Sequence, residues 1–435
     1  MSQTRPERHP SDPAGQAMYG LVQRLFPICR SLTGDGVRQT LRILGEQIPL
    51  QVLEVETGTQ VFDWSVPKEW NIRGAFIEDP RGKRILDFKD NNLHVVGYST
   101  PVDARLTLEE LQEHLHSLAD LPDAIPYITS YYSEHWGFCL PHTQRLNLEK
   151  GEYHVVIDSE LKDGHLSYGE CLIPGETAEE VFLSTYICHP SMANNELSGP
   201  VVATFLAQWL LSAPRRFSYR IVFVPETIGS ITYLSKNLQH LKRNVVAGFN
   251  ITCVGDERVY SFLPSRAGNT LADRSATHVL DHTHPGFIRW TYLDRGSDER
   301  QYCSPGVDLP VASVMRSKYG SYPEYHTSLD NLDFVTPTGL QGSYDVLQMC
   351  ILVLEANRVY RATSLGEPQL GRRGLYPTLS TRDTKQQVQK MMDLLAYADG
   401  EHDLIEIGTI TGVPAWELAP YAETLTAEGL LAVVR

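Results

Sequence analysis

The sequence contains no Cys-x-x-Cys pair, no low-complexity segment and no apolar run long enough to span a bilayer. Its seven cysteines are scattered and odd in number, so neither a zinc finger nor a disulfide framework is predicted. The segment from Met1 to Gln16 is polar, contains Pro10 and Pro13, and lacks the apolar core of a secretory signal peptide. This cysteine usage favours a reducing compartment, and we expect the protein to be cytoplasmic.

Basic residues are also in short supply. The chain has 38 Lys and Arg against 53 Asp and Glu, which gives a net charge of −15. Such a charge disfavours non-specific binding to nucleic acid or to anionic membranes, so neither is expected as a partner. Hydrophobic residues make up 42% of the chain, as in globular proteins, and 435 residues are more than one core usually holds. We therefore expect two or three domains.

The middle of the chain alternates between strand and helix patterns. Residues 153–161 and 164–173 are predicted to be two paired strands. They are followed by predicted strands at 181–187, 219–224 and 246–253, with helices at 201–211 and from Ser230 onward. Strands that alternate with helices indicate a mixed, mainly parallel sheet flanked by helices, an α/β fold. Ligands in such folds bind at the carboxyl ends of the strands.

The flanking segments differ in character. Helical spacing predicts two helices between residues 15 and 47, whereas short apolar runs separated by turn residues predict a small inserted β-rich domain at 51–124. The α/β domain would then comprise residues 1–50 and 125–365. After a Pro- and Gly-rich stretch, helices at 384–396, 403–408 and 414–425 and a strand at 430–434 give a winged-helix outline for residues 370–435.

Four segments carry the residues best suited to chemistry. His189 follows a strand and begins a polar loop that reaches Asn195 and ends in Ser-Gly before a helix. Glu226 and Asp256 each lie just past another predicted strand, and His326 occurs in a Tyr-His-Thr-x-x-Asp run. Imidazoles and carboxylates gathered on one rim of a parallel sheet suit one or two zinc ions and metal-assisted hydrolysis.

The order of these segments resembles the zinc exopeptidases that include bacterial leucyl aminopeptidase and glutaminyl cyclase. From end to end the chain more closely resembles a bacterial aminopeptidase-like family that has an exopeptidase sheet, an inserted β domain and a C-terminal winged helix. The blocks that carry this resemblance are CHPS (188–191), PETIGS (225–230), LPSR (263–266) and YPEYHTSLD (322–330). The resemblance implies a metal set of His189, Asn195, Glu226, Asp256 and His326, with Glu226 also the candidate catalytic base. Members of that family are often associated with polysaccharide or secondary-metabolite pathways, which implies a small amide substrate.

Three departures from the exopeptidase pattern bear on this prediction. Asn195 stands where the pattern has the aspartate that bridges two metal ions, and an amide offers only one carbonyl oxygen. Pro225 precedes Glu226 where the pattern has two consecutive glutamates, so Glu226 can be the base or a ligand but not both. Thr252 stands at the position of the remaining aspartate ligand, and Asp256 replaces it only if the strand end bends toward the metal.

Each candidate also has a structural reading. His189 and His326 could be ordinary loop histidines, Glu226 could cap the helix it enters, and Asp256 could belong to a plain turn. Arg266 is a candidate for a substrate carboxylate, with Asp298 and Tyr325 as further substrate-binding candidates. Arg295, Arg300 and Lys318 could serve the same purpose, although solvation or ion pairing is the simpler reading for each. The tyrosines at 319, 322 and 325 could line a pocket or stack within the fold.

The winged helix raises the question of DNA binding. Between residues 371 and 435 there are six basic and nine acidic side chains, and the segment 414–425, which would be the recognition helix, contains no Lys or Arg. A helix that enters a DNA groove normally needs both base-reading and phosphate-neutralising side chains. We therefore interpret this domain as a module for packing, dimerisation or covering a site, which leaves a homo-oligomer open.

The sequence thus predicts a cytoplasmic, zinc-dependent aminopeptidase or amidase that acts on a small amino-acyl amide or peptide. The alternative is an exopeptidase fold whose catalysis is impaired by Asn195 and which serves as a binding or scaffold protein. A third hypothesis, DNA-linked regulation through the winged helix, is disfavoured by the charge of that segment.

Overall fold

The computed structural model describes residues 13–131, 133–375 and 382–434. The polar segment predicted at the N-terminus falls mostly on residues 1–12, outside the described residues. The chain divides into two compact units. One comprises residues up to Gly268 together with 288–344, and the other comprises 269–287 and 345–435.

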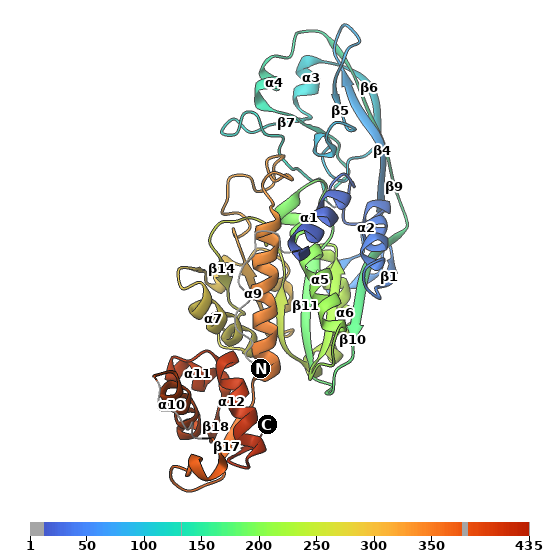
Figure 1. Ribbon diagram of the computed structural model, residues 1–435. Helices are drawn as coiled ribbons and strands as arrows, with labels where there is room; N and C mark the ends of the chain where they lie inside the picture. Colours follow the sequence, from blue (N-terminus) through green and yellow to red (C-terminus); the bar gives the residue numbers. More distant parts are fainter. Residues whose placement is uncertain (1–12, 132, 376–381, 435) are drawn as a thin grey trace. The chain divides into compact units, whose positions relative to one another are not determined.

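An eight-stranded sheet forms the centre of the first unit (Figure 1). Its strand order is β1-β10-β12-β11-β13-β16-β14-β15, and the four strands β12, β11, β13 and β16 run parallel. The strands are β1 (Gln51–Glu56), β10 (His165–Ile173), β12 (Ser218–Val224), β11 (Glu180–Tyr186), β13 (Val245–Asn250), β16 (Val311–Met315), β14 (Ser261–Leu263) and β15 (Ile288–Arg289). The mixed α/β fold with a parallel centre is confirmed.

Helices cover both faces of this sheet. On one face lie α2 (Asp35–Gly45) and α5 (Ser198–Leu211), with α1 (Pro13–Leu25) packed against α5. On the other face lie α6 (Ile228–Asn244) and the short α8 (Glu299–Tyr302), next to a core that includes Phe182 and Val224. Every residue of β11 is buried, as expected for a parallel strand covered on both sides. The apolar centre of this strand, from Val181 to Leu183, follows from that position.

A smaller four-stranded antiparallel sheet, in the order β5-β4-β9-β6, belongs to the same unit. Its strands are β4 (Glu69–Glu78), β5 (Arg84–Asp87), β6 (Val102–Thr107) and β9 (Glu152–Lys162). Around it lie α3 (Leu108–Gln112), α4 (His142–Leu146) and the short strand pair β7 (Leu115–His116) with β8 (Phe138–Cys139). Ile77, Leu86, Val155 and Ile157 contribute to the separate apolar core of the small sheet. Another short pair, β2 (Gln60–Val61) with β3 (Trp64–Ser65), packs beside α6 and the core of the main sheet.

The prediction that residues 153–161 and 164–173 pair with each other is wrong. β9 pairs with β4 and β6 in the small sheet, whereas β10 pairs with β1 and β12 in the main sheet. The linker between them is held open by partners from elsewhere, because Glu69 accepts a hydrogen bond from the His165 backbone and Thr57 donates to the Gly164 carbonyl. The chain therefore crosses from one sheet to the other instead of folding back. β1, from the segment predicted as the small β domain, belongs to the main sheet.

The second unit contains the winged helix. Its elements are β17 (Val359–Ala362), α10 (Arg382–Tyr397), β18 (Asp399–Asp403), α11 (Leu404–Thr411), α12 (Ala415–Ala427) and β19 (Leu431–Val433), and α7 (Leu271–Thr283) belongs to the same unit. The three strands form one antiparallel sheet in the order β18-β17-β19. The long helix α9 (Pro337–Ala356) begins in the first unit and leads into the second. Among the described residues, no helix combines the length and apolarity needed to cross a membrane.

Candidate functional site

Two imidazoles lie close together at the carboxyl end of the main sheet. His189 follows β11, and its ring centroid is 5.4 Å from that of His326, which comes from the loop before α9. Tyr127 packs edge-on against both rings, at 5.2 Å from His189 and 5.0 Å from His326. Tyr325 stacks on His326 with a centroid distance of 3.9 Å. Two residues 137 positions apart in the sequence are thus held in one aromatic enclosure, although only His189 was predicted to follow a strand.

A buried ion pair of Glu196 with Arg30 fixes the orientation of the His189 ring through its Nδ1 atom. Nδ1 of the ring lies 3.0 Å from Oε2 of Glu196, and Oε1 of the same carboxylate is 3.0 Å from Nε of Arg30. The side chains of Arg30 and Glu196 are both 0% exposed. Arg30 Nε also donates to the His189 carbonyl at 2.9 Å. A carboxylate on Nδ1 is the usual partner of a metal-binding histidine, because it leaves Nε2 free to act as the ligand.

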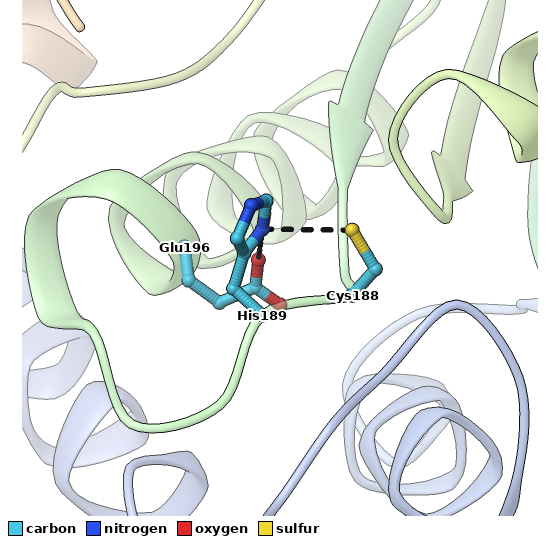
Figure 2. A group of neighbouring side chains, drawn as sticks. All are labelled: Cys188, His189 and Glu196. Atoms are coloured by element: carbon cyan, nitrogen blue, oxygen red, sulfur yellow. Dashed lines mark hydrogen bonds and ion pairs between the residues drawn. The ribbon is translucent and has the colours of Figure 1, made fainter. Parts of the chain in front are cut away.

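Among the described residues, one group of three has its ligand-type atoms within 4.8 Å of one another, namely Cys188, His189 and Glu196 (Figure 2). The thiol of Cys188 and the carboxylate of Glu196 both approach the same ring nitrogen, Nδ1. Burial raises the pKa of Cys188 to about 11, so the sulfur is a thiol at neutral pH. Glu196 is already neutralised by Arg30. We therefore interpret this group as the support of His189 and not as a metal site.

Glu226 lies on the open side of His189. It follows β12, its Oε2 is 3.7 Å from Nε2 of His189, and its side chain is 22% exposed. Burial raises the pKa of the Glu226 carboxyl, an effect that the neighbouring His189 opposes. The next residue, Thr227, has a φ of 64°, in the left-handed region that non-glycine residues rarely adopt. Because the chain turns so sharply here, Glu226 is presented at the strand end before α6 begins.

Asp298 lies behind that turn. Its Oδ1 accepts hydrogen bonds from the Thr227 backbone at 2.7 Å and from the Ser230 hydroxyl at 2.8 Å, and the residue is 0% exposed. Burial, reinforced by the nearby Glu226, raises the pKa of Asp298 to about 8. The predicted substrate-binding residue Asp298 thus contacts the backbone that carries Glu226 and has no exposed surface to offer a substrate.

Asn195 sits in a single π-type turn, Ala193–Leu197, that leads directly into α5. Its side-chain nitrogen donates to the Tyr186 hydroxyl at 2.7 Å, which fixes the orientation of the amide. Within the described part of the chain, its Oδ1 is buried and has no hydrogen-bond partner, and the same holds for Nε2 of His326. Buried polar atoms without partners are rare and costly, so these two atoms are candidates for binding a group from outside the chain.

Asp330 connects the two loops that carry these atoms. Its two carboxylate oxygens accept the backbone N–H groups of Asn194 and Asn195, at 2.6 Å and 2.9 Å. Its own backbone carbonyl accepts from Ala193 at 2.9 Å. The Asp in the Tyr-His-Thr-x-x-Asp run thus holds the Asn195 turn in place beside the loop of His326.

The structure does not bring Asp256 into this group. β13 ends at Asn250, and the Asp256 carboxylate accepts hydrogen bonds from the backbone of Arg258, from both the backbone and the hydroxyl of Ser317, and from the Asn194 amide. With four donors on its two oxygens, Asp256 stabilises the loop that carries Asn194. Arg266 also lies apart, since it pairs with Asp308 and donates to the Cys303 carbonyl.

The residues present fit one divalent ion better than two. By residue type, His189, His326, Asn195 and Glu226 offer two nitrogen and two oxygen donors, a set that suits zinc, and in this structure the ligand atoms of His189, Glu226 and His326 do not all lie within 4.8 Å of one another. The only carboxylate among them is Glu226, whereas a second ion would need another carboxylate to bridge the two ions.

The sequence did not identify Arg30 and Glu196, because their roles depend on contacts between residues 166 positions apart. The signal that was available was the one acidic side chain, Glu196, in the polar loop after His189.

Comparison with known proteins agrees with this architecture. Residues 19–357 match a family described as a domain of unknown function, DUF4910, and residues 358–433 match a winged helix-turn-helix family. A relative from Clostridium acetobutylicum is 44% identical over 426 residues, which is 98% of each chain. It is provisionally described as a polysaccharide biosynthesis protein with an aminopeptidase-like domain.

Two solved structures extend the comparison. A crystal structure from Clostridium acetobutylicum, provisionally described as a peptidase, has a TM-score of 0.92 at 44% identity and covers 97% of this chain and 96% of its own. A zinc aminopeptidase from Bacillus subtilis has a TM-score of 0.55 at 14% identity, covers 78% of this chain and 94% of its own, and shares the fold. This chain therefore belongs to the DUF4910 family, whose aminopeptidase-like α/β fold is joined here to a C-terminal winged helix.

Proposed function

We propose that the protein is a hydrolase that uses a single zinc ion to cleave an amide bond in a small amino-acyl amide or peptide. The observation that carries this proposal is the proximity of His189 to both His326 and Glu226. Two buried atoms without partners among the described residues support it: Nε2 of His326, and Oδ1 of Asn195, whose side chain bonds to Tyr186, a ring 5.3 Å from that of His189. The aminopeptidase-like fold supports it, because in such folds ligands bind at this end of the sheet.

The ion would be held by His189, His326 and Asn195. When bound, zinc polarises the substrate carbonyl and lowers the pKa of a coordinated water to about 7. The ion pair of Glu196 with Arg30 keeps Nδ1 of His189 occupied, so that only Nε2 is presented to the site. Tyr127 and Tyr325 cover the faces and edges of the imidazoles and exclude water from them.

Glu226 is best placed to move the proton. A half-buried carboxylate 3.7 Å from the free nitrogen of His189 can accept a proton from the attacking water and deliver it to the amide nitrogen. The oxygen of the water bonds to the carbonyl carbon, the C–N bond breaks, and the departing amine takes the proton. When Glu226 acts as the base, the remaining ligands are His189, His326 and Asn195, which are all neutral. Three neutral ligands favour one ion over two.

The experiment that tests this proposal is metal analysis of the purified chain, combined with hydrolysis of a panel of amino-acyl amides before and after chelation. We expect about one zinc per chain, loss of hydrolysis with the chelator and recovery on adding zinc back. A chain that binds no metal, or whose hydrolysis is indifferent to the chelator, contradicts the proposal.

A second candidate function follows from Asn195 and Asp256. Of the five candidate metal ligands, Asn195 is a neutral amide and Asp256 is a carboxylate already saturated with donors. That observation favours a binding or scaffold protein with the exopeptidase fold. In that case the purified chain binds small amides without cleaving them, and added zinc produces no hydrolysis.

A further inference from the structure

A cluster of cationic side chains shares the rim of the sheet with the proposed zinc site. The strand order β12-β11-β13-β16 sets the carboxyl ends of these parallel strands in a row. Glu226 follows β12, His189 follows β11, and Arg316 and Lys318 follow β16. The cations thus lie further along the edge at which folds of this type bind their ligands.

These cations line a cavity of about 190 Å³. Its walls include Arg258, Arg316, Lys318, Trp290 and Tyr322. A chain with a net charge of −15 that gathers three basic side chains around one cavity creates a local field opposite to its overall charge. Concave sites that combine aromatic walls with a few converging polar groups are the usual form of a small-molecule site.

Two cations of this cavity, Arg258 and Lys318, differ in how far they are neutralised. Arg258 is paired with Glu324 through contacts of 3.0 Å and 2.9 Å. Lys318 Nζ donates to the Tyr319 carbonyl at 3.1 Å, and within residues 13–131, 133–375 and 382–434 no carboxylate lies within 4.0 Å of it. Asp294 and Glu299 act on it only from a distance, and burial lowers its pKa. An anion that entered the cavity would therefore meet a partly desolvated ammonium group.

Trp290 adds an aromatic wall and a donor. Lys318 Nζ lies 5.1 Å from the centroid of the Trp290 ring and 4.2 Å from that of Tyr319. The indole Nε1 of Trp290 is buried and has no acceptor among the described residues. An acidic group with several acceptor oxygens would satisfy both the ammonium and this part of the wall.

Tyrosine rings connect the cavity to the imidazoles. Tyr322, in the cavity wall, packs at 5.6 Å against Tyr325, which in turn stacks on His326. Ser317, also in the wall, donates to Asp256, which accepts from Asn194 in the turn of the candidate metal site. The cavity and the candidate metal site therefore share the loop that carries Tyr322, Tyr325 and His326, so that one molecule could contact both.

We propose that this cavity is a subsite for the carboxylate or phosphate of an elongated substrate, so that the enzyme selects amides that carry an acidic group beyond the scissile bond. The choice of substrate class rests on the proposed hydrolytic function, whereas the binding of an anion in the cavity does not. Lys318 supplies the charge, and Trp290 and Tyr322 supply the walls.

Binding of the anion is tested first, by calorimetric titration of the full chain with inorganic phosphate and with acetate at low salt. We expect saturable binding of at least one of them, weakened at least tenfold in Lys318→Met and retained in Lys318→Arg. Lys236→Met on the exposed surface of α6 makes the same change in net charge and should leave binding as it is. Absence of binding to the unaltered chain, or binding that Lys318→Met does not affect, overturns the proposal.

Substrate selection is tested with leucyl-glutamate and leucyl-glutamine, which differ in one carboxylate. We expect a lower KM for leucyl-glutamate, and Lys318→Met should remove that advantage while kcat changes little. Added phosphate should compete with leucyl-glutamate more than with leucyl-glutamine. Equal KM values combined with Lys318-dependent phosphate binding would mean that the anion is a separate effector, which overturns the substrate assignment. If neither dipeptide is cleaved although phosphate binds, the hydrolytic function fails and the anion site stands.

Discussion

Two polar clusters at the carboxyl end of the main sheet differ in how completely their hydrogen bonds are made. Around Asp256, four donors converge on two oxygens. Around His189 and His326, an imidazole nitrogen and an amide oxygen are buried without partners. The first cluster is complete without any added group, whereas the second is not. Within the described residues, this difference makes Asn195 the better candidate ligand of the two, although a carboxylate such as Asp256 is the more typical zinc ligand.

The largest expected difference between the two clusters appears when one residue of each is replaced by alanine. His326→Ala should abolish zinc binding and lower the hydrolysis rate by about 10³-fold, because the ion contributes several kcal/mol to the transition state. Asp256→Ala should instead keep the zinc and lower the free energy of unfolding by about 1–3 kcal/mol, since it leaves buried donors without an acceptor. Metal analysis and chemical denaturation of both variants provide the measurements. Retention of zinc in His326→Ala together with its loss in Asp256→Ala would reverse our assignment of the two clusters.

The support of His189 gives the next largest effect. Glu196→Gln removes the charge that neutralises buried Arg30, and an ion pair broken in this way costs about 3–5 kcal/mol of stability. Because the partner of Nδ1 changes too, zinc affinity should fall by about 10–100-fold. Competition with a zinc chelator measures the second effect and denaturation the first.

Glu46→Gln is the matched control, because it makes the same substitution in the exposed pair of Glu46 with Arg24. It should leave stability and zinc affinity nearly unchanged. If Glu196→Gln bound zinc as tightly as the unaltered chain, Glu196 would be structural only.

Asn195→Asp is expected to strengthen zinc binding, whereas His326→Ala and Glu196→Gln weaken it. The new carboxylate should raise zinc affinity at least tenfold and permit a second ion, and hydrolysis should increase. Without metal, the same variant should unfold more easily, because an extra charge is buried beside Tyr186. Asn194→Asp, one residue away, places a carboxylate against Asp256 and should destabilise the chain without any gain in metal binding. Metal stoichiometry and unfolding temperature, each measured with and without zinc, distinguish these outcomes.

A smaller effect is expected in the winged-helix unit. His278 accepts a hydrogen bond from the Ala415 backbone at Nε2, and burial lowers the pKa of His278 to about 4. Between pH 6.5 and 4 the unfolded chain binds this proton and the native chain does not, so stability is full above pH 6.5 and is lost as the pH falls. At pH 5 the expected loss is roughly 2 kcal/mol relative to pH 7.

His282 and Asp281 on α7 and Asp403 at the start of α11 also act on this ring. Denaturation of His278→Gln as a function of pH should show a shallower slope over this range than the unaltered chain. An identical slope would assign the pH dependence to those neighbours.

The sequence predicted the outline of this arrangement because strand ends are local features. His189 and Glu226 end neighbouring parallel strands, so their presence on one rim follows from the alternation of strands and helices alone. Asp256 could not be judged in the same way, since the donors that saturate it come from Asn194 and Ser317, far away in the chain. The two paired strands expected at 153–173 failed for a similar reason: Glu69 and Thr57, distant in sequence, hold the connection between them open.

The role of Glu196 shows where sequence reasoning stopped. In the structure the Glu196 carboxylate faces Nδ1 of His189 and the guanidinium of Arg30, whereas the neighbouring Asn195 donates to Tyr186. What Glu196 does depends on Arg30, 166 positions earlier, and neither spacing nor periodicity reveals such a contact. Whether His189, Asn195, Glu226 and His326 bind zinc stays a prediction, as do the domain boundaries.

The dependence on Arg30 has a consequence for the order in which the protein can mature during synthesis. The guanidinium leaves the ribosome early, between the first two helices, and its carboxylate follows much later. His326 and Asp330, which complete the enclosure, come later still. Removing α1 and α2 together with Arg30 would leave Glu196 as an unpaired charge in the interior, so these two helices belong to the same folded body as the central sheet.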